Sequence, residues 1–99
     1  RADGTLQRLI RELKDGKFDA VLFTSAVQVQ YLFAEADVSG DGVTLRRTFR
    51  ERTLAVAVGV VTAEALEDAG VSRLIQSENQ RMGGMVVELN RYFASDRQG

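Results

Sequence analysis

Apolar residues recur at helical spacing in several parts of the chain, and short uninterrupted apolar runs lie between them. Positions 6, 9, 10 and 13 carry leucine or isoleucine, an i, i+3, i+4, i+7 stripe that predicts an amphipathic helix. Positions 29, 32, 33 and 36 repeat this spacing and predict a second helix. The runs Ala20–Phe23 and Leu54–Val58 are apolar at every position, which is typical of strands buried on both faces.

Glycine and small polar residues mark where the elements begin and end. Gly16 suits the position just after the first helix, where a left-handed backbone is common. Ser25 is a good N-cap for the second helix, and Thr44 and Thr62 are expected to cap two shorter ones. The remaining elements are expected as helices at 45–50 and 63–69, a strand at 72–76 and a last helix at 85–94.

This order of elements predicts an α/β fold with a parallel sheet and helices on both of its faces, because strands that alternate with helices are joined by right-handed crossovers. Three strands are few for such a sheet, so we expect it to gain strands from chain outside these 99 residues. Ligands of open α/β sheets bind beyond the carboxyl ends of the strands. The two turns that follow the apolar strands are therefore the candidate binding site.

Each of these turns leads into a helix N-terminus, where free N–H groups and a partial positive charge favour carboxylates or phosphates. The first turn is Thr24-Ser25-Ala26, and the second is 59–62, which lacks the GxxxxGK[ST] and GxGxxG patterns. Ordinary capping by Ser25 and Thr62 explains the same residues and is the commoner case. Nearby acidic residues likewise favour a solvated helix face over an anion site for the arginines at 46, 47, 50 and 52.

Composition excludes several classes of function. Thirteen Lys and Arg residues against 14 Asp and Glu give a net charge of −1, without the cationic excess of a nucleic-acid or membrane-surface binder. The chain has no Cys and no His, so disulfides, the usual zinc sites and Ser-His-Asp triads are excluded within it, and no metal site is expected. No apolar run reaches the roughly 20 residues that span a bilayer. We expect a cytoplasmic protein whose site works mainly by binding and orienting a reactive substrate.

Three segments resemble one family, the uroporphyrinogen-III synthases. FDAVLFTSA at 18–26 is similar to a strand and turn of that family. VAVGVVTAEAL at 56–66 is similar to a later strand, turn and helix, and RMGGMV at 81–86 to the opening of the final helix. The resemblance extends over about residues 5–93. Its order and spacing identify the chain as similar to the C-terminal part of the family.

The resemblance implies a fold and an activity. The family folds as two α/β domains, so residues 1–99 would be one partial flavodoxin/Rossmann-like domain of a two-domain protein. Its enzymes are lyases that take hydroxymethylbilane, remove water, invert the D ring and close the macrocycle, without a metal or organic cofactor. The cleft lies between the domains. The rest of the chain, including the N-terminal domain, would be the partner of this fragment, and the fragment alone would be inactive.

The resemblance also assigns residues to the cleft. The substrate-binding residues would be Thr24, Ser25, Ala26, Gly59, Val60, Val61 and Thr62, whose backbone N–H groups would hold acetate or propionate carboxylates. The hydroxyl of Thr62 would also assist the leaving group, which makes it the candidate catalytic residue. Val60 stands where the family often has proline. The family's tyrosine near the linker lies outside this chain, and neither Tyr31 nor Tyr92 fills its position.

Two alternatives remain open. Some bacterial proteins join a synthase-like region to a DNA-binding domain and resemble transcriptional regulators, so nucleic acid would be a partner only through such a fusion. A synthase-like domain that binds a tetrapyrrole without turning it over is the other alternative.

Overall fold

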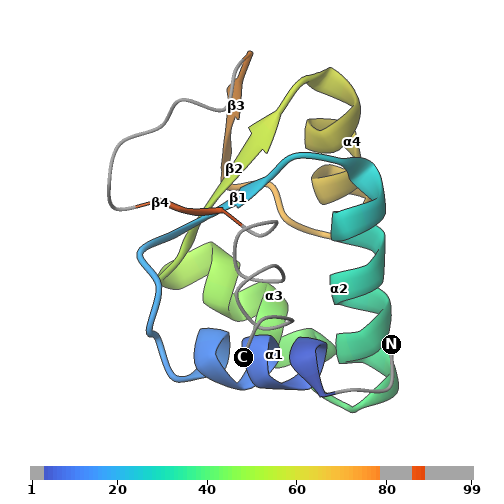
Figure 1. The fold of residues 1–99 in the computed structure, drawn as a ribbon, viewed down its shortest axis with the longest axis vertical. Coiled ribbons are helices and arrows are strands. Elements are labelled where there is room, and N and C mark those ends of the chain that lie inside the picture. The colour runs from blue at the N-terminus through green and yellow to red at the C-terminus, as the bar shows by residue number, and fades with distance from the viewer. Residues whose placement is uncertain (1–3, 79–85, 89–99) are drawn as a thin grey trace.

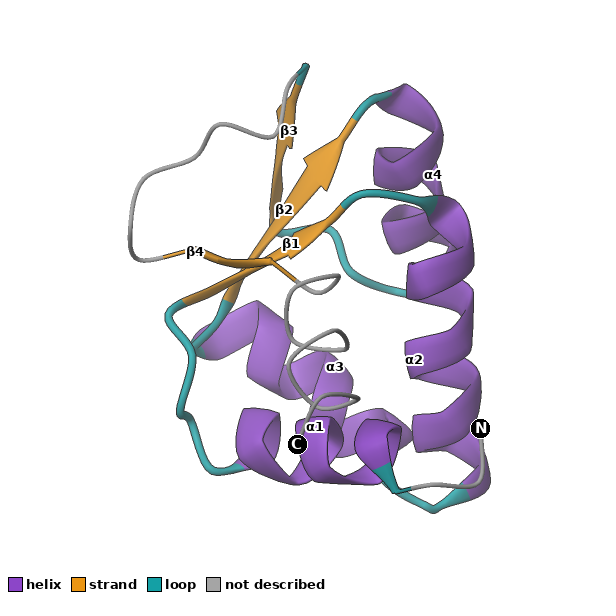
Figure 2. Ribbon diagram, viewed as in Figure 1, coloured by secondary structure: helices purple, strands orange, loops and turns teal. Residues whose placement is uncertain are grey.

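The computed structural model describes residues 4–78 and 86–88. Helices and strands alternate through most of it, as Figures 1 and 2 show. In chain order the elements are α1 (Thr5–Lys14), β1 (Ala20–Phe23), α2 (Ala26–Val38), α3 (Gly42–Glu51), β2 (Leu54–Val58), α4 (Val60–Asp68), β3 (Leu74–Ser77) and β4 (Val86–Glu88). No helix in the described part of the chain is long and apolar enough to cross a bilayer.

The strands form one parallel sheet in the order β3-β2-β1-β4. Strands β1 and β2 lie at its centre and pair in a register that places Ala20 opposite Leu54. Complete burial, expected from the uninterrupted apolar runs, holds for every residue of β1 and for the three central residues of β2, whose two end residues are half-buried. The fold is therefore α/β with a parallel sheet, as the sequence predicts.

The fourth strand comes from within the chain, where the sequence predicts a helix. Residues 86–88 pair with β1 in parallel, so the predicted helix at 85–94 is wrong over these positions. Its apolar residues have helical spacing, but a three-residue strand is too short for periodicity to reveal. Pairing with β4 provides hydrogen-bond partners for backbone groups of β1 on the side away from β2. This pairing depends on contacts between distant segments, which the local sequence pattern does not reveal. The rest of the predicted helix lies outside the described residues.

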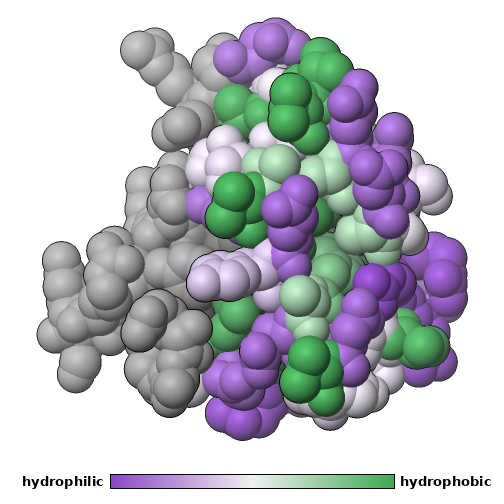
Figure 3. All heavy atoms as spheres, turned by 90° about the vertical axis from the view of Figure 1, so that its right-hand side faces the viewer, coloured by the Kyte–Doolittle hydropathy of each residue, from purple (hydrophilic) through white to green (hydrophobic). Residues whose placement is uncertain are grey.

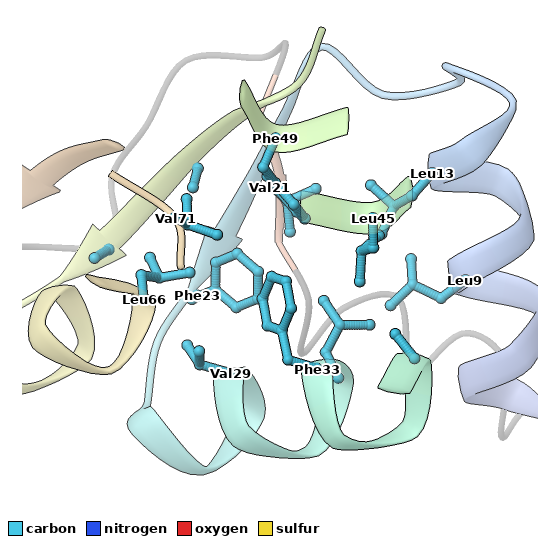
Figure 4. Close-up of a cluster of buried hydrophobic side chains, with 14 of the residues drawn as sticks. Leu9, Leu13, Val21, Phe23, Val29, Phe33, Leu45, Phe49, Leu66 and Val71 are labelled. Atoms are coloured by element: carbon cyan, nitrogen blue, oxygen red, sulfur yellow. The ribbon is translucent and has the colours of Figure 1, made fainter. Parts of the chain in front are cut away.

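The described helices pack on one face of the sheet. Alternate strand residues, among them Val21, Phe23 and Ala57, point into a core that contains side chains from all four helices (Figure 4). In this core the ring of Phe49 lies 5.9 Å from the rings of both Phe23 and Phe33. The intervening strand residues form a smaller cluster on the opposite face: Ala20, Leu22 and Val56.

The end of α1 follows the local rule expected from the sequence, whereas the start of α3 does not. Gly16, at φ 75°, ends α1 as predicted: its N–H bonds to Leu13 O, and the next N–H bonds to Glu12 O. Thr44 does not cap α3, because this helix begins two residues earlier, at Gly42. The N-cap is Asp41, whose carboxylate receives a hydrogen bond from Lys14 Nζ at 2.8 Å instead of capping the helix.

Candidate functional site

Two strand-to-helix turns meet at one edge of the sheet. Strands β1 and β2 are parallel neighbours, so their carboxyl ends lie side by side, and helices α2 and α4 begin just beyond them. The two helices pack against each other, and Figure 1 shows both starting in the upper right part of the view, α4 above α2. The topology therefore brings both predicted turns together, as expected for neighbouring parallel strands.

Hydrogen bonds between Ser25, Thr24 and Gln28 close the first turn. Ser25 caps α2 as predicted, since its Oγ accepts from the N–H of Gln28 at 3.3 Å. In return, Gln28 Oε1 accepts from the N–H of Thr24 at 2.8 Å and from its hydroxyl at 3.2 Å. Sequence reasoning missed Gln28, although Ser-x-x-Gln is the signature of a capping box. Because the N–H of Gln28 already donates to Ser25, the first-turn donors left without an acceptor inside the helix are those of Ala26 and Val27.

Gly59 shapes the second turn. Its φ of 86° and ψ of 165° lie in a region that is essentially reserved for glycine. Its N–H donates to Ser77 O at 2.8 Å, and its carbonyl accepts from the N–H of Ala63 at 3.2 Å. The turn is thus tied to β3 on one side and begins α4 on the other.

Thr62 is not the cap of this helix, which corrects the sequence prediction. Helix α4 begins at Val60 with Gly59 as its N-cap, because the positive φ of Gly59 turns the chain directly into the helix. Thr62 lies in the first turn and is only 3% exposed, whereas Val60 and Val61 are 53% and 69% exposed. The N–H groups of these three residues precede the first bonded N–H of the helix, that of Ala63.

Around the two turns, the partial positive charges of two helix N-termini lie near exposed apolar side chains. Neither α2 nor α4 has an acidic residue in its first turn, so no carboxylate there offsets the partial positive charge of the helix N-terminus. Val27 and Tyr31 on α2 are exposed, like Val60 and Val61 on α4. Figure 3 looks onto the helical side and shows apolar areas separated by polar ones, one of them near the top. Such an edge can bind a molecule that carries carboxylates on an apolar framework.

The arginines that follow α2 lie elsewhere. Arg46 makes an ion pair with Asp37 at 2.8 Å, while the arginines at 47, 50 and 52 are exposed. The described residues include no group of three or more Asp or Glu side chains arranged to hold a metal ion.

Comparisons with known proteins bear on the family and the fold of the chain. The family profile described as Uroporphyrinogen-III synthase HemD matches residues 1–87. The uncharacterized protein YjjA of Bacillus subtilis (strain 168) is 48% identical over 89 residues, which cover 90% of this chain and 33% of that protein. The crystal structure of a mutant uroporphyrinogen III synthase from the extremely thermophilic bacterium Thermus thermophilus superposes with a TM-score of 0.63 at 31% identity, over 92% of this chain and 32% of that one.

This chain spans about a third of the length of both relatives. The match to the family profile covers all the elements from α1 to β3, including both turns. The chain belongs to the uroporphyrinogen-III synthase HemD family.

Proposed function

We propose that this chain is part of a uroporphyrinogen-III synthase and that its two adjacent turns bind the carboxylates of hydroxymethylbilane. Family membership supports the reaction class, and the pairing of two helix N-termini at one sheet edge supports the ligand class. That pairing is the observation that carries the proposal, because a chain with several carboxylates needs more than one anchor. The donors would be the N–H groups of Ala26 and Val27 at one turn and of residues 60–62 at the other.

In the proposed reaction the main task of the protein is to hold the two ends of the substrate in a reactive orientation. The terminal pyrrole of hydroxymethylbilane expels hydroxide with its own ring electrons, which leaves an electrophilic methylene carbon. The substituted α-carbon of the D ring would attack this carbon and form a spiro intermediate. The bond from that α-carbon to its original methylene bridge would then break, and the freed methylene would bond to the other α-carbon of the D ring, which loses its proton, so that the macrocycle closes with the D ring inverted. Holding the two ends of the linear substrate in contact converts their encounter into a well-oriented intramolecular step, an effect that reaches about 7–11 kcal/mol. Exposed apolar side chains such as Val60 and Val61 would contact the pyrrole rings.

Thr62 keeps the role of candidate catalytic residue in this proposal. Its N–H belongs to the anion-binding first turn of α4, and its hydroxyl would donate a hydrogen bond to the departing oxygen. The 3% exposure of the residue means that this hydroxyl would reach the substrate only at the buried floor of the cleft. Substitutions that separate the hydroxyl from the packing of the side chain therefore test this role.

The test is a product analysis with the full-length protein and freshly prepared hydroxymethylbilane. Spontaneous closure gives isomer I of uroporphyrinogen, so enzymatic turnover is recognised as isomer III after chromatographic separation. We expect isomer III to predominate. A folded protein that yields isomer I alone, but binds the tetrapyrrole, would replace the proposed enzyme with a tetrapyrrole-binding domain.

A further inference from the structure

One guanidinium group connects three helices at the C-terminal ends of α2 and α4. Arg46, on α3, donates through Nη1 and Nη2 to the two carboxylate oxygens of Asp37, at 2.8 and 3.3 Å. Through Nε it donates to the carbonyl oxygen of Ala69 at 2.5 Å. Asp37 lies in the last turn of α2, and Ala69 is the C-cap of α4. The same side chain thus bonds to both helices that carry the proposed site.

The surroundings leave space for this arrangement. The guanidinium carbon lies 5.1 Å from the centre of the Phe33 ring, a cation–π contact. A Cβ atom at Gly42 would overlap the Asp37 carboxylate, and one at Gly70 would lie 3.2 Å from Arg46 Cδ. Gly42 is helical and has no positive φ, so its backbone does not demand glycine. Glycine is a poorer helix former than alanine, and room for the Arg46–Asp37 pair explains its presence at the first position of α3.

We propose that Arg46 is a positioning residue for the reaction proposed above, an inference that rests on that proposed function. The strands hold the N-terminal ends of α2 and α4, and Arg46 holds their C-terminal ends. It thereby sets the angle between the helices and the directions in which their first N–H groups point. Arginine suits this role, since its planar fork binds a carboxylate in two places while Nε remains for a third acceptor.

A small tilt of α2 is enough to displace the N–H groups at its N-terminus. Helix α2 has 13 residues, which makes it about 20 Å long, so a tilt of about 3° displaces one end by about 1 Å relative to the other. A displacement of that size can reduce a rate by about a hundredfold when two groups must be held in reacting geometry. A substrate anchored at both helix N-termini depends on their relative orientation in this way.

The test compares Arg46→Gln and Arg46→Lys with the matched control Arg47→Gln, which removes an exposed charge from the neighbouring position of the same helix. Each full-length variant is assayed for isomer III formation at a temperature well below its own Tm. Both Arg46 variants are expected to lower kcat/KM by about tenfold or more, with a raised KM, while the Arg47 variant keeps wild-type values.

Gly42→Ala is a second test, which leaves both charged groups in place. Its Cβ would push the Asp37 carboxylate away from Arg46, so it is expected to lower kcat/KM in the same direction. Lowered Tm values with wild-type KM and kcat in the folded variants would show that Arg46 is structural only and would overturn the inference. A wild-type protein that makes no isomer III would instead overturn the proposed function, and this inference with it.

Discussion

Replacing Val60 with proline removes one backbone donor from the proposed site and nothing else from the hydrogen-bonding pattern of α4. Val60 is the first residue of the helix, and the first N–H bonded within the helix is that of Ala63. Proline is favoured at this first position, where its missing N–H is not needed. The preceding residue, Gly59, has a ψ of 165°, an extended value of the kind that a residue before proline adopts. The substitution therefore fits the backbone.

The expected result is a more stable protein that binds its substrate less well, because Val60 would supply a donor that a protein with proline at this position, as the resembled family often has, would lack. Proline at a compatible position stabilises a protein by about 0.4–1 kcal/mol through the unfolded chain. A hydrogen bond to a charged group contributes about 1.5–3 kcal/mol. Because Val60 is 53% exposed, the lower end applies, which corresponds to a rise in KM of about tenfold.

The assay is steady-state formation of isomer III by the full-length protein, with Val60→Ala as the control that shortens the side chain but keeps the N–H. Thermal unfolding of both variants checks the stability change. Equal KM values for Val60→Pro and Val60→Ala would show that this N–H does not hold a substrate carboxylate.

Three further predictions concern the second turn and the ion pairs. Thr62→Val should lower kcat by about a hundredfold while Thr62→Ser stays close to wild type, if the hydroxyl assists the leaving group; equal kcat values in the two variants would assign Thr62 a packing role alone. Gly59→Ala should destabilise the protein by about 1–3 kcal/mol in denaturant unfolding, because a Cβ has space there but the backbone conformation is strained; an unchanged midpoint would speak against that strain. Hydrogen bonds from Arg46 lower the pKa of Asp37, and a hydrogen bond from Lys14 lowers that of Asp41. Lowered pKa values in the folded state mean that these pairs stabilise the protein above the ordinary pKa of aspartate and lose that contribution as the pH falls below about 4. Asp37→Asn should therefore flatten the acid limb of the stability curve, and an identical limb would contradict the assignment.

Much of the fold is predictable from the sequence because its strongest signals are local. The apolar runs of β1 and β2 and the stripes of α1 and α2 each report burial directly. Ser25 is predicted correctly as a cap because serine is a preferred N-cap residue and stands between a buried strand and an amphipathic helix. These elements also place the two turns at one edge of the sheet, since parallel strands leave no other arrangement.

The features that escape prediction depend on contacts between distant segments. Strand β4 forms by pairing with β1, and its three residues are too few to show a strand pattern in the sequence. Thr62 has the chemistry of a cap, but the backbone of Gly59, tied to Ser77 in β3, starts the helix earlier. The partners of Arg46 lie nine and 23 positions away in the chain. Only the folded arrangement distinguishes this arginine from its exposed neighbours.

Amide hydrogen exchange of the full-length protein, with and without the product uroporphyrinogen III, tests whether the two turns hold the carboxylates of the tetrapyrrole. Unbonded N–H groups at helix starts exchange rapidly, and a bound carboxylate slows them. We expect slowed exchange at residues 26–27 and 60–62 on binding, with no change at the loop 39–41, which lies at the other end of α2. Saturating product that leaves both turns unprotected would contradict the assignment of these turns as the substrate site.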